Sequence, residues 1–81
     1  MKVRVQLFAI AKDLAGRSAV DLELPEPATV ADLRQALAEA VADLRPIARH
    51  LSFAVNADYA LDVTKIPFGA EVACIPPVSG G

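Results

Sequence analysis

The residues best suited to chemistry lie at the end of this 81-residue chain, in the segment Pro76-Pro77-Val78-Ser79-Gly80-Gly81. Pro76 and Pro77 fix φ and favour an extended exit from whatever precedes them. The segment can then reach roughly 20 Å at ~3.3 Å per residue. Gly80 and Gly81 have no side chains, so this end can enter a narrow channel that excludes other residues. We therefore expect the tail to present the carboxylate of Gly81 for reaction, rather than to be an inert terminus.

Few other residues are candidates for chemistry, because the chain has one His and one Cys. His50 has no Cys, Asp or second His near it in sequence, so no metal site is expected. Cys74 lies on the apolar side of the last predicted strand, where burial suppresses the thiolate and disfavours a persulfide. Asp58 and Asp62 flank a short predicted strand, but paired-carboxylate catalysis needs a cleft that the sequence does not predict.

The length and composition restrict the class of protein. A chain of 81 residues allows one small domain. The net charge of −2 and the scattered Lys and Arg residues argue against nucleic acid as the main partner. No apolar stretch approaches the ~20 residues that span a bilayer, so no membrane is expected. A single Cys and the lack of a signal-like start indicate the cytoplasm.

The tail must be positioned by a domain whose first half reads as two strands and a loop. Apolar and polar residues alternate from residue 2 to residue 7, which predicts a strand within residues 1–10 with one buried face. Residues 11–17 read as a loop with one helical turn near Lys12. A second alternating run predicts a strand over 18–24, ended by Pro25 and Pro27. Their closeness in sequence favours a hairpin.

A helix is predicted from Thr29 to about Arg45. Thr29 is a typical N-cap residue, and Asp32 three residues later resembles a capping box. Pro46 disfavours helical geometry at the residue before it, so the helix should end there. Apolar residues at helical spacing form one stripe: Val30, Leu33, Leu37, Val41 and Leu44.

The second half reads as three more strands, over residues 51–56, 59–61 and 71–75, after an irregular stretch at 47–50. Residues 56–58 look like a turn, and residues 62–70 like a loop. The resulting order of strand, strand, helix, strand, short strand and strand is an α+β layout. One helix can cover one face of such a four- or five-stranded sheet.

The ending at residues 71–81, with its Pro-Pro-Val-Ser-Gly-Gly tail, resembles the small subunits of molybdopterin synthases, the sulfur carriers of molybdenum-cofactor synthesis. The thiamine sulfur carrier and ubiquitin also end in Gly-Gly, but usually without the double proline. Similar segments extend the resemblance over nearly the whole chain: residues 5–9, 14–16, 29–33 and 54–56. One departure is Ala70, where the family commonly has Asp, and it leaves the tail unchanged.

The resemblance implies a ubiquitin-like β-grasp fold over residues 1–75, with a mixed sheet and one main helix, followed by a tail of residues 76–81. It also implies that an adenylating enzyme activates Gly81 with ATP, and that a sulfur donor protein converts it to a thiocarboxylate. The tail would then enter the large catalytic subunit, in a heterotetramer, and donate sulfur to cyclic pyranopterin monophosphate to form the molybdopterin dithiolene. Catalytic side chains would come from the partner, and this chain would bind no cofactor itself.

An interaction surface follows from strand alternation combined with the resemblance. If Val3, Val5 and Leu7 face the helix, Phe8 faces away, and Ile75 faces away if Val72 and Cys74 face in. In a β-grasp sheet the first and last strands are neighbours, so an apolar cluster should lie on the uncovered face. The resemblance implies that the chain docks on the large subunit through three apolar residues, Phe8, Tyr59 and Ile75, and through the basic residue Lys12.

Other functions stay open from the sequence. The chain could carry sulfur for another pathway, such as thiamine or cysteine synthesis. It could also be a protein modifier that is conjugated through Gly81 to lysines. A third possibility is an interaction domain whose tail has no chemistry.

Overall fold

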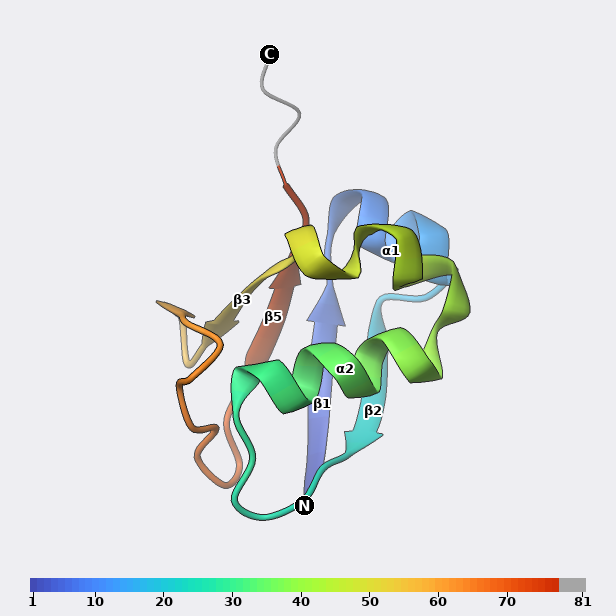
Figure 1. The fold of residues 1–81 in the computed structure, drawn as a ribbon. Coiled ribbons are helices and arrows are strands. Elements are labelled where there is room, and N and C mark those ends of the chain that lie inside the picture. Colours follow the sequence, from blue (N-terminus) through green and yellow to red (C-terminus); the bar gives the residue numbers. More distant parts are fainter. Residues whose placement is uncertain (78–81) are drawn as a thin grey trace.

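A five-stranded mixed sheet forms the frame of the computed structural model, which describes residues 1–77 (Figure 1). The strand order is β2-β1-β5-β3-β4, with β1 parallel to β5 and the other neighbours antiparallel. The predicted hairpin of the first two strands and the adjacency of the first and last strands are both confirmed. The strands are β1 Lys2–Leu7, β2 Ala19–Glu23, β3 Ser52–Val55, β4 Asp58–Ala60 and β5 Val72–Ile75.

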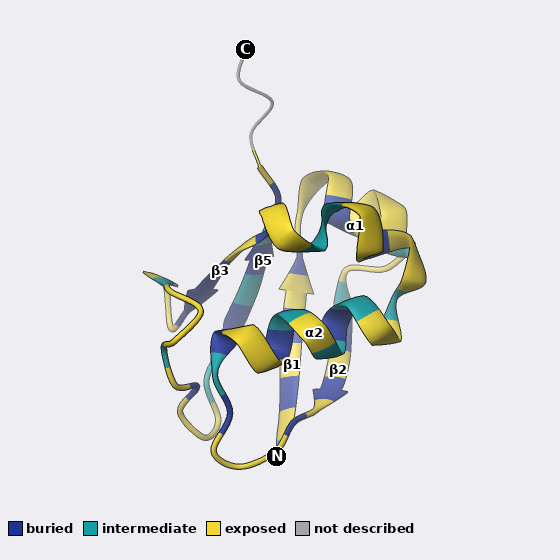
Figure 2. Ribbon diagram, in the orientation of Figure 1, coloured by how far each residue is buried: buried dark blue, intermediate teal, exposed yellow. Residues whose placement is uncertain are grey.

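The helices lie together on one face of this sheet, which confirms the predicted α+β class (Figure 1). Helix α2, Val30–Ala40, crosses the strands and buries Val30, Leu33 and Leu37 against them. Strand β1 alternates strictly between exposed and buried residues, so its apolar side chains enter the core between the sheet and α2 (Figure 2). Within residues 1–77 no helix is long and apolar enough to cross a membrane.

The N-terminus of α2 has the predicted capping box. The Asp32 amide donates to Oγ1 of Thr29 at 3.3 Å, and the Thr29 amide donates to Oδ2 of Asp32 at 2.9 Å. Two backbone donors without helical partners are thereby satisfied, and the Asp32 carboxylate lies at the positive end of the helix dipole. Local sequence therefore determines where this helix begins.

The predicted end of this helix at Arg45 is wrong. Helix α2 ends at Ala40, Val41 is extended, and a 3₁₀ helix, η1, follows over Ala42–His50, where an irregular stretch was expected. Pro46 lies inside η1, beyond the break, whereas Arg45 donates to the carbonyls of Ala38 and Glu39 and so satisfies carbonyls at the end of α2. Leu44 nevertheless remains fully buried, so the apolar stripe predicts burial correctly although the helix changes direction.

A second helix, α1, spans Ala9–Ala15, where a loop with one helical turn was predicted. Phe8 is its N-cap residue, and Gly16 closes it in the left-handed conformation with φ 71°, donating its N–H to the Lys12 carbonyl at 2.9 Å. Ala11 is fully buried and anchors the helix to the core. The glycine that follows this alanine-rich segment is a C-cap signal that supports a helix here.

Arg34 of α2 links three segments that are distant in sequence. Its Nη1 donates to the carbonyls of Ala48 and Leu51, at 2.7 and 2.6 Å, and its Nη2 donates to Oδ1 of Asp62 at 2.7 Å. The guanidinium carbon also lies 5.1 Å from the centre of the Phe53 ring, within cation–π range. Arg34 therefore holds the end of η1 and the segment after β4 against α2.

The turn between β3 and β4 supplies a test of backbone strain. Asn56 and Ala57 both have positive φ, 51° and 72°, as in a type I′ turn, so β4 starts one residue earlier than predicted. Alanine is strained in this region, whereas glycine is not. We expect Ala57→Gly to raise the free energy of unfolding in urea by about 0.5–1 kcal/mol. Ala31→Gly, on the exposed side of α2, should lower it by about 1 kcal/mol, and equal losses for both variants would contradict the strain.

Candidate functional site

The described base of the tail leaves from the middle of the sheet. Strand β5 lies between β1 and β3, where Cys74 pairs with Leu7 and Ile75 pairs with Ser52. Pro76 follows directly and is buried, while Pro77 is exposed. The base of the tail is thus held by hydrogen bonds on both sides of its strand. The predicted tail residues Val78, Ser79, Gly80 and Gly81 lie outside the described residues, and the division at residue 76 stays a prediction.

The uncovered face of the sheet has a shallow depression near the base of the tail. Register aligns Gln6, Ala73, Ala54 and Tyr59 in one row across four strands. Alanines in the middle of this row leave a hollow of about 250 Å³, and Phe8 lines it. Small side chains flanked by larger ones suit the docking of a protruding apolar group. We call this hollow the alanine depression.

The structure brings three of the predicted interface residues to this face. Phe8 is 50% exposed and borders the alanine depression, although it caps α1 and does not continue β1. Tyr59 is 74% exposed and lies opposite Ala54, and Ile75 is half-buried two residues beyond Ala73. Lys12 is exposed on α1, where its backbone N–H donates to the carbonyl of Phe8 at 3.4 Å. Their role in docking stays a prediction.

Sequence reasoning missed other exposed apolar side chains. Ile10 and Leu14 lie four residues apart on the outer side of α1, a spacing that is visible once the segment is read as a helix. Three more follow β4 in a segment without regular structure: Leu61, Val63 and Phe68. The lack of periodicity there left no signal for their exposure.

Cys74 is fully buried between β1 and β3. Burial raises the pKa of its thiol from 9.0 to about 11, and the charge of Arg34 opposes the rise. Because the thiolate is the nucleophilic form, this cysteine is poorly suited to carry sulfur. The structure therefore supports its interpretation as a small apolar core residue.

The raised pKa of Cys74 predicts a loss of stability in alkali. The thiol ionises near pH 9.0 in the unfolded chain but only near pH 11 in the folded protein. Ionisation between these two values therefore favours the unfolded state. The folded state has its full stability with respect to Cys74 below pH 9.0 and loses it as pH rises through 11. The loss should be on the order of 3 kcal/mol. Urea unfolding at a series of pH values should show this fall, and the difference from Cys74→Ala isolates it from other groups. Parallel pH profiles for the two proteins would contradict the shift.

The three remaining candidates for chemistry, His50, Asp58 and Asp62, are all exposed, and two of them contact an arginine. His50 is exposed and accepts a hydrogen bond from Nε of Arg49 at 3.3 Å. Asp62 pairs with Arg34, whereas Asp58 opens β4. In residues 1–77 no three His, Cys, Asp or Glu side chains gather in a way that could hold a metal ion. The tail and the uncovered face thus remain the candidate site.

Comparison with known proteins shows which family this chain belongs to and which solved structures share its fold. The sequence profile of the ThiS family matches residues 5–81. A molybdopterin synthase sulfur carrier subunit of Chlamydomonas reinhardtii is 34% identical, with all of both chains covered. The structure of SAMP1, a small archaeal modifier protein of Haloferax volcanii, is 30% identical with a TM-score of 0.85, over 100% of both chains. A putative molybdopterin converting factor subunit 1 from Pyrococcus furiosus is 29% identical, with a TM-score of 0.84 over 96% of this chain and 99% of that one. These structures confirm the predicted ubiquitin-like β-grasp fold.

Proposed function

The chain belongs to the ThiS family, and on that premise we propose that it is the sulfur carrier subunit of a molybdopterin synthase, with Gly81 as the sulfur-bearing residue. The observation that carries this proposal is the 34% identity to a named sulfur carrier subunit over the whole of both chains. The tail sequence from Pro76 to Gly81 supports it, because the double proline distinguishes this ending from other Gly-Gly endings.

The proposed chemistry begins with a carboxylate that does not react by itself. An adenylating enzyme joins the Gly81 carboxylate to the AMP part of ATP and releases pyrophosphate. AMP is a good leaving group, so sulfur at the sulfide level, supplied by a donor protein, can displace it and leave a thiocarboxylate at Gly81. Sulfur is soft and nucleophilic, and it attacks the pterin precursor, cyclic pyranopterin monophosphate, once the tail lies in the large subunit. Water then cleaves the bond between this sulfur and the Gly81 carbonyl, so the sulfur stays on the pterin and the Gly81 carboxylate is regenerated. Two such deliveries complete the molybdopterin dithiolene.

The structure supports a division of labour between this chain and its partners. Burial raises the pKa of the Cys74 thiol to about 11 and makes this residue poorly suited to carry sulfur, which in this proposal is the role of Gly81. The central strand β5 and Pro76 hold the base of the tail, which allows the tip to be directed into another protein. In this proposal Phe8, Tyr59 and Ile75 dock on the large subunit, and Lys12 pairs with an acidic partner residue.

Intact mass spectrometry of the protein from its native host tests the proposal. A carrier should show a gain of mass equal to the replacement of one oxygen by sulfur, located in the C-terminal peptide. The gain should disappear when the adenylating enzyme is absent. A chain that never carries this sulfur, in cells that make the molybdenum cofactor, would overturn the proposal.

A second function, modification of other proteins, is favoured by the similarity to SAMP1, at 30% identity and a TM-score of 0.85. Both functions require activation of the Gly81 carboxylate, but the acceptor differs. In a modifier, the amine of a lysine displaces AMP and forms an isopeptide bond. Conjugates of higher mass in the same mass spectra, with peptides branched at lysine, would identify this function.

A further inference from the structure

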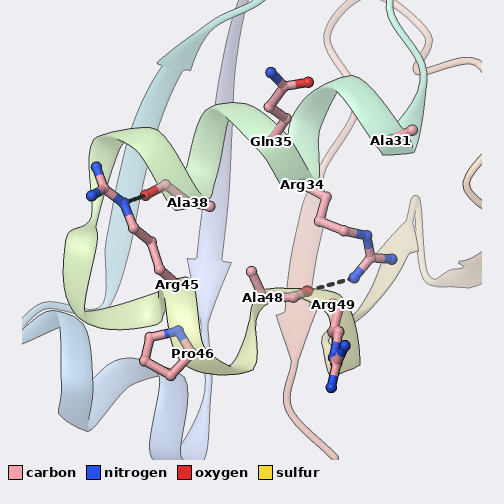
Figure 3. Close-up of a pocket in the computed structure, with 8 residues that line it drawn as sticks. All are labelled: Ala31, Arg34, Gln35, Ala38, Arg45, Pro46, Ala48 and Arg49. Atoms are coloured by element: carbon pink, nitrogen blue, oxygen red, sulfur yellow. Dashed lines mark hydrogen bonds between the residues drawn. The ribbon is translucent and has the colours of Figure 1, made fainter.

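A groove between α2 and η1 concentrates positive charge on the helical side of the molecule (Figure 3). Its volume is about 490 Å³, and the lining includes three of the eight basic residues of the chain but no acidic residue. The chain as a whole has a net charge of −2, so the positive charge at the groove is a local concentration and not a property of the whole molecule. We call it the arginine groove, and its lining is Ala31, Arg34, Gln35, Ala38, Arg45, Pro46, Ala48 and Arg49.

The three arginines differ in the hydrogen bonds and ion pairs that they form within the protein. Arg34 donates three hydrogen bonds, to the carbonyls of Ala48 and Leu51 and to the carboxylate of Asp62. Arg45 donates only to the carbonyls of Ala38 and Glu39, and the Nε of Arg49 donates only to the adjacent histidine. Within residues 1–77 neither Arg45 nor Arg49 forms an ion pair. Two guanidinium charges at the groove therefore lack a compensating carboxylate.

The positions of these two guanidinium groups determine the kind of anion that fits. Arg45 and Arg49 point in different directions, with Pro46 and Ala48 between them (Figure 3). A single phosphate or carboxylate does not bridge two guanidinium groups that point apart. An extended peptide presents side chains at repeated positions ~6.6 Å apart along one face, so it can place a separate carboxylate at each arginine.

The lining of the groove also favours a peptide. Half of it consists of small apolar residues, namely three alanines and Pro46, and small side chains let another backbone approach closely. Arg34 holds Ala48 and Leu51 to α2, which keeps the two walls at a constant separation. The groove thus has walls held together by hydrogen bonds, small apolar side chains in its lining, and two arginines that form no ion pair with the described residues.

We propose that the arginine groove binds an extended acidic segment of a partner protein, with one carboxylate at Arg45 and another at Arg49. Arginine and carboxylate form charge-assisted hydrogen bonds that are stronger than neutral ones. The groove lies in the helical layer, away from the alanine depression on the uncovered sheet face. Both surfaces can therefore be occupied together, and binding at the groove does not depend on sulfur transfer at Gly81.

Titration of the full-length, ¹⁵N-labelled protein with an alternating Glu-Ala peptide tests this proposal, with a Gln-Ala peptide as the uncharged control. Chemical-shift changes should cluster at amides of the groove, and rising salt should weaken binding. Arg49→Glu should lower the affinity about tenfold. Arg17→Glu makes the same charge change at an exposed residue outside the groove and should alter the affinity less than about twofold.

Three results would overturn the proposal. The first is equal binding of the Gln-Ala peptide, which would mean that charge does not drive recognition. The second is an equal loss in Arg17→Glu, which would mean that the whole surface attracts the peptide. The third is tighter binding of inorganic phosphate or ATP at the same amides, which would identify a site for small anions. Matching amide spectra of both variants outside the altered positions would show that neither has unfolded.

Discussion

Removal of Gly81 is expected to abolish sulfur transfer while the domain stays folded. The shortened chain still ends in a glycine carboxylate, but that carboxylate lies ~3.3 Å closer to the domain. Reacting groups must be placed within fractions of an ångström, and a displacement of about 1 Å can already cost about 100-fold in rate. Formation of the dithiolene should therefore fall by more than about 100-fold.

The measurement is a reconstitution with the adenylating enzyme, a sulfur source, the large subunit and the pterin precursor, in which the dithiolene product is quantified. The melting temperature should not change, because the core of the described domain lies N-terminal to the tail. Binding to the large subunit through the uncovered face should also persist. Product formation at the normal rate by the shortened chain would sink the proposed role of Gly81.

Phe8→Asp is expected to disrupt docking on the large subunit without unfolding the chain. Phe8 borders the alanine depression, so the substitution places a charge at the point where an apolar partner surface would press. Truncation of a central aromatic residue in an interface commonly costs 2 kcal/mol or more, and we expect binding to weaken at least ~30-fold. Calorimetric titration of the large subunit with each variant measures this effect.

A loss of binding in Phe8→Asp should not come from unfolding, because Phe8 is the N-cap of α1 and its side chain makes no capping hydrogen bond. Aspartate is a favoured N-cap residue and interacts well with the positive end of a helix, so the free energy of unfolding should be unchanged or raised by about 0.5–1 kcal/mol. Phe68→Asp is the matched control, because Phe68 is 82% exposed and does not line the depression. Equal loss of binding in both variants would mean that the depression is not the docking surface.

Several elements were predictable because their signals are local. Alternation of apolar and polar residues identifies β1 and β2, and burial of alternate side chains is all that a half-covered sheet requires. The Thr29–Asp32 capping box determines the start of α2 from two residues three positions apart. The prediction of an extended tail with an unobstructed glycine end likewise rests on residue types alone, since proline restricts the backbone and glycine frees it wherever they occur.

The break after Ala40 was not predictable from periodicity. Burial of Leu44 requires only that an apolar residue face the core, and both a straight helix and a redirected 3₁₀ helix meet that requirement. The redirected helix is stabilised by distant partners, through hydrogen bonds from Arg45 to Ala38 and from Arg34 to Ala48. A local pattern contains no information about such contacts.

The sequence by itself determined the strand alternation and the start of α2, because each depends on neighbouring residues, and residue types alone led to the prediction that Gly81 is the reacting residue. Tertiary structure alone decided where the surfaces lie. It placed Phe8 beside the alanines of β3 and β5, and it brought Arg45 and Arg49 to one groove with α2. Strand pairing brings Phe8, Ala54 and Ala73 together from distant parts of the chain. The change of direction after Ala40 folds η1 back beside α2, so that Arg45 and Arg49 line a groove with it.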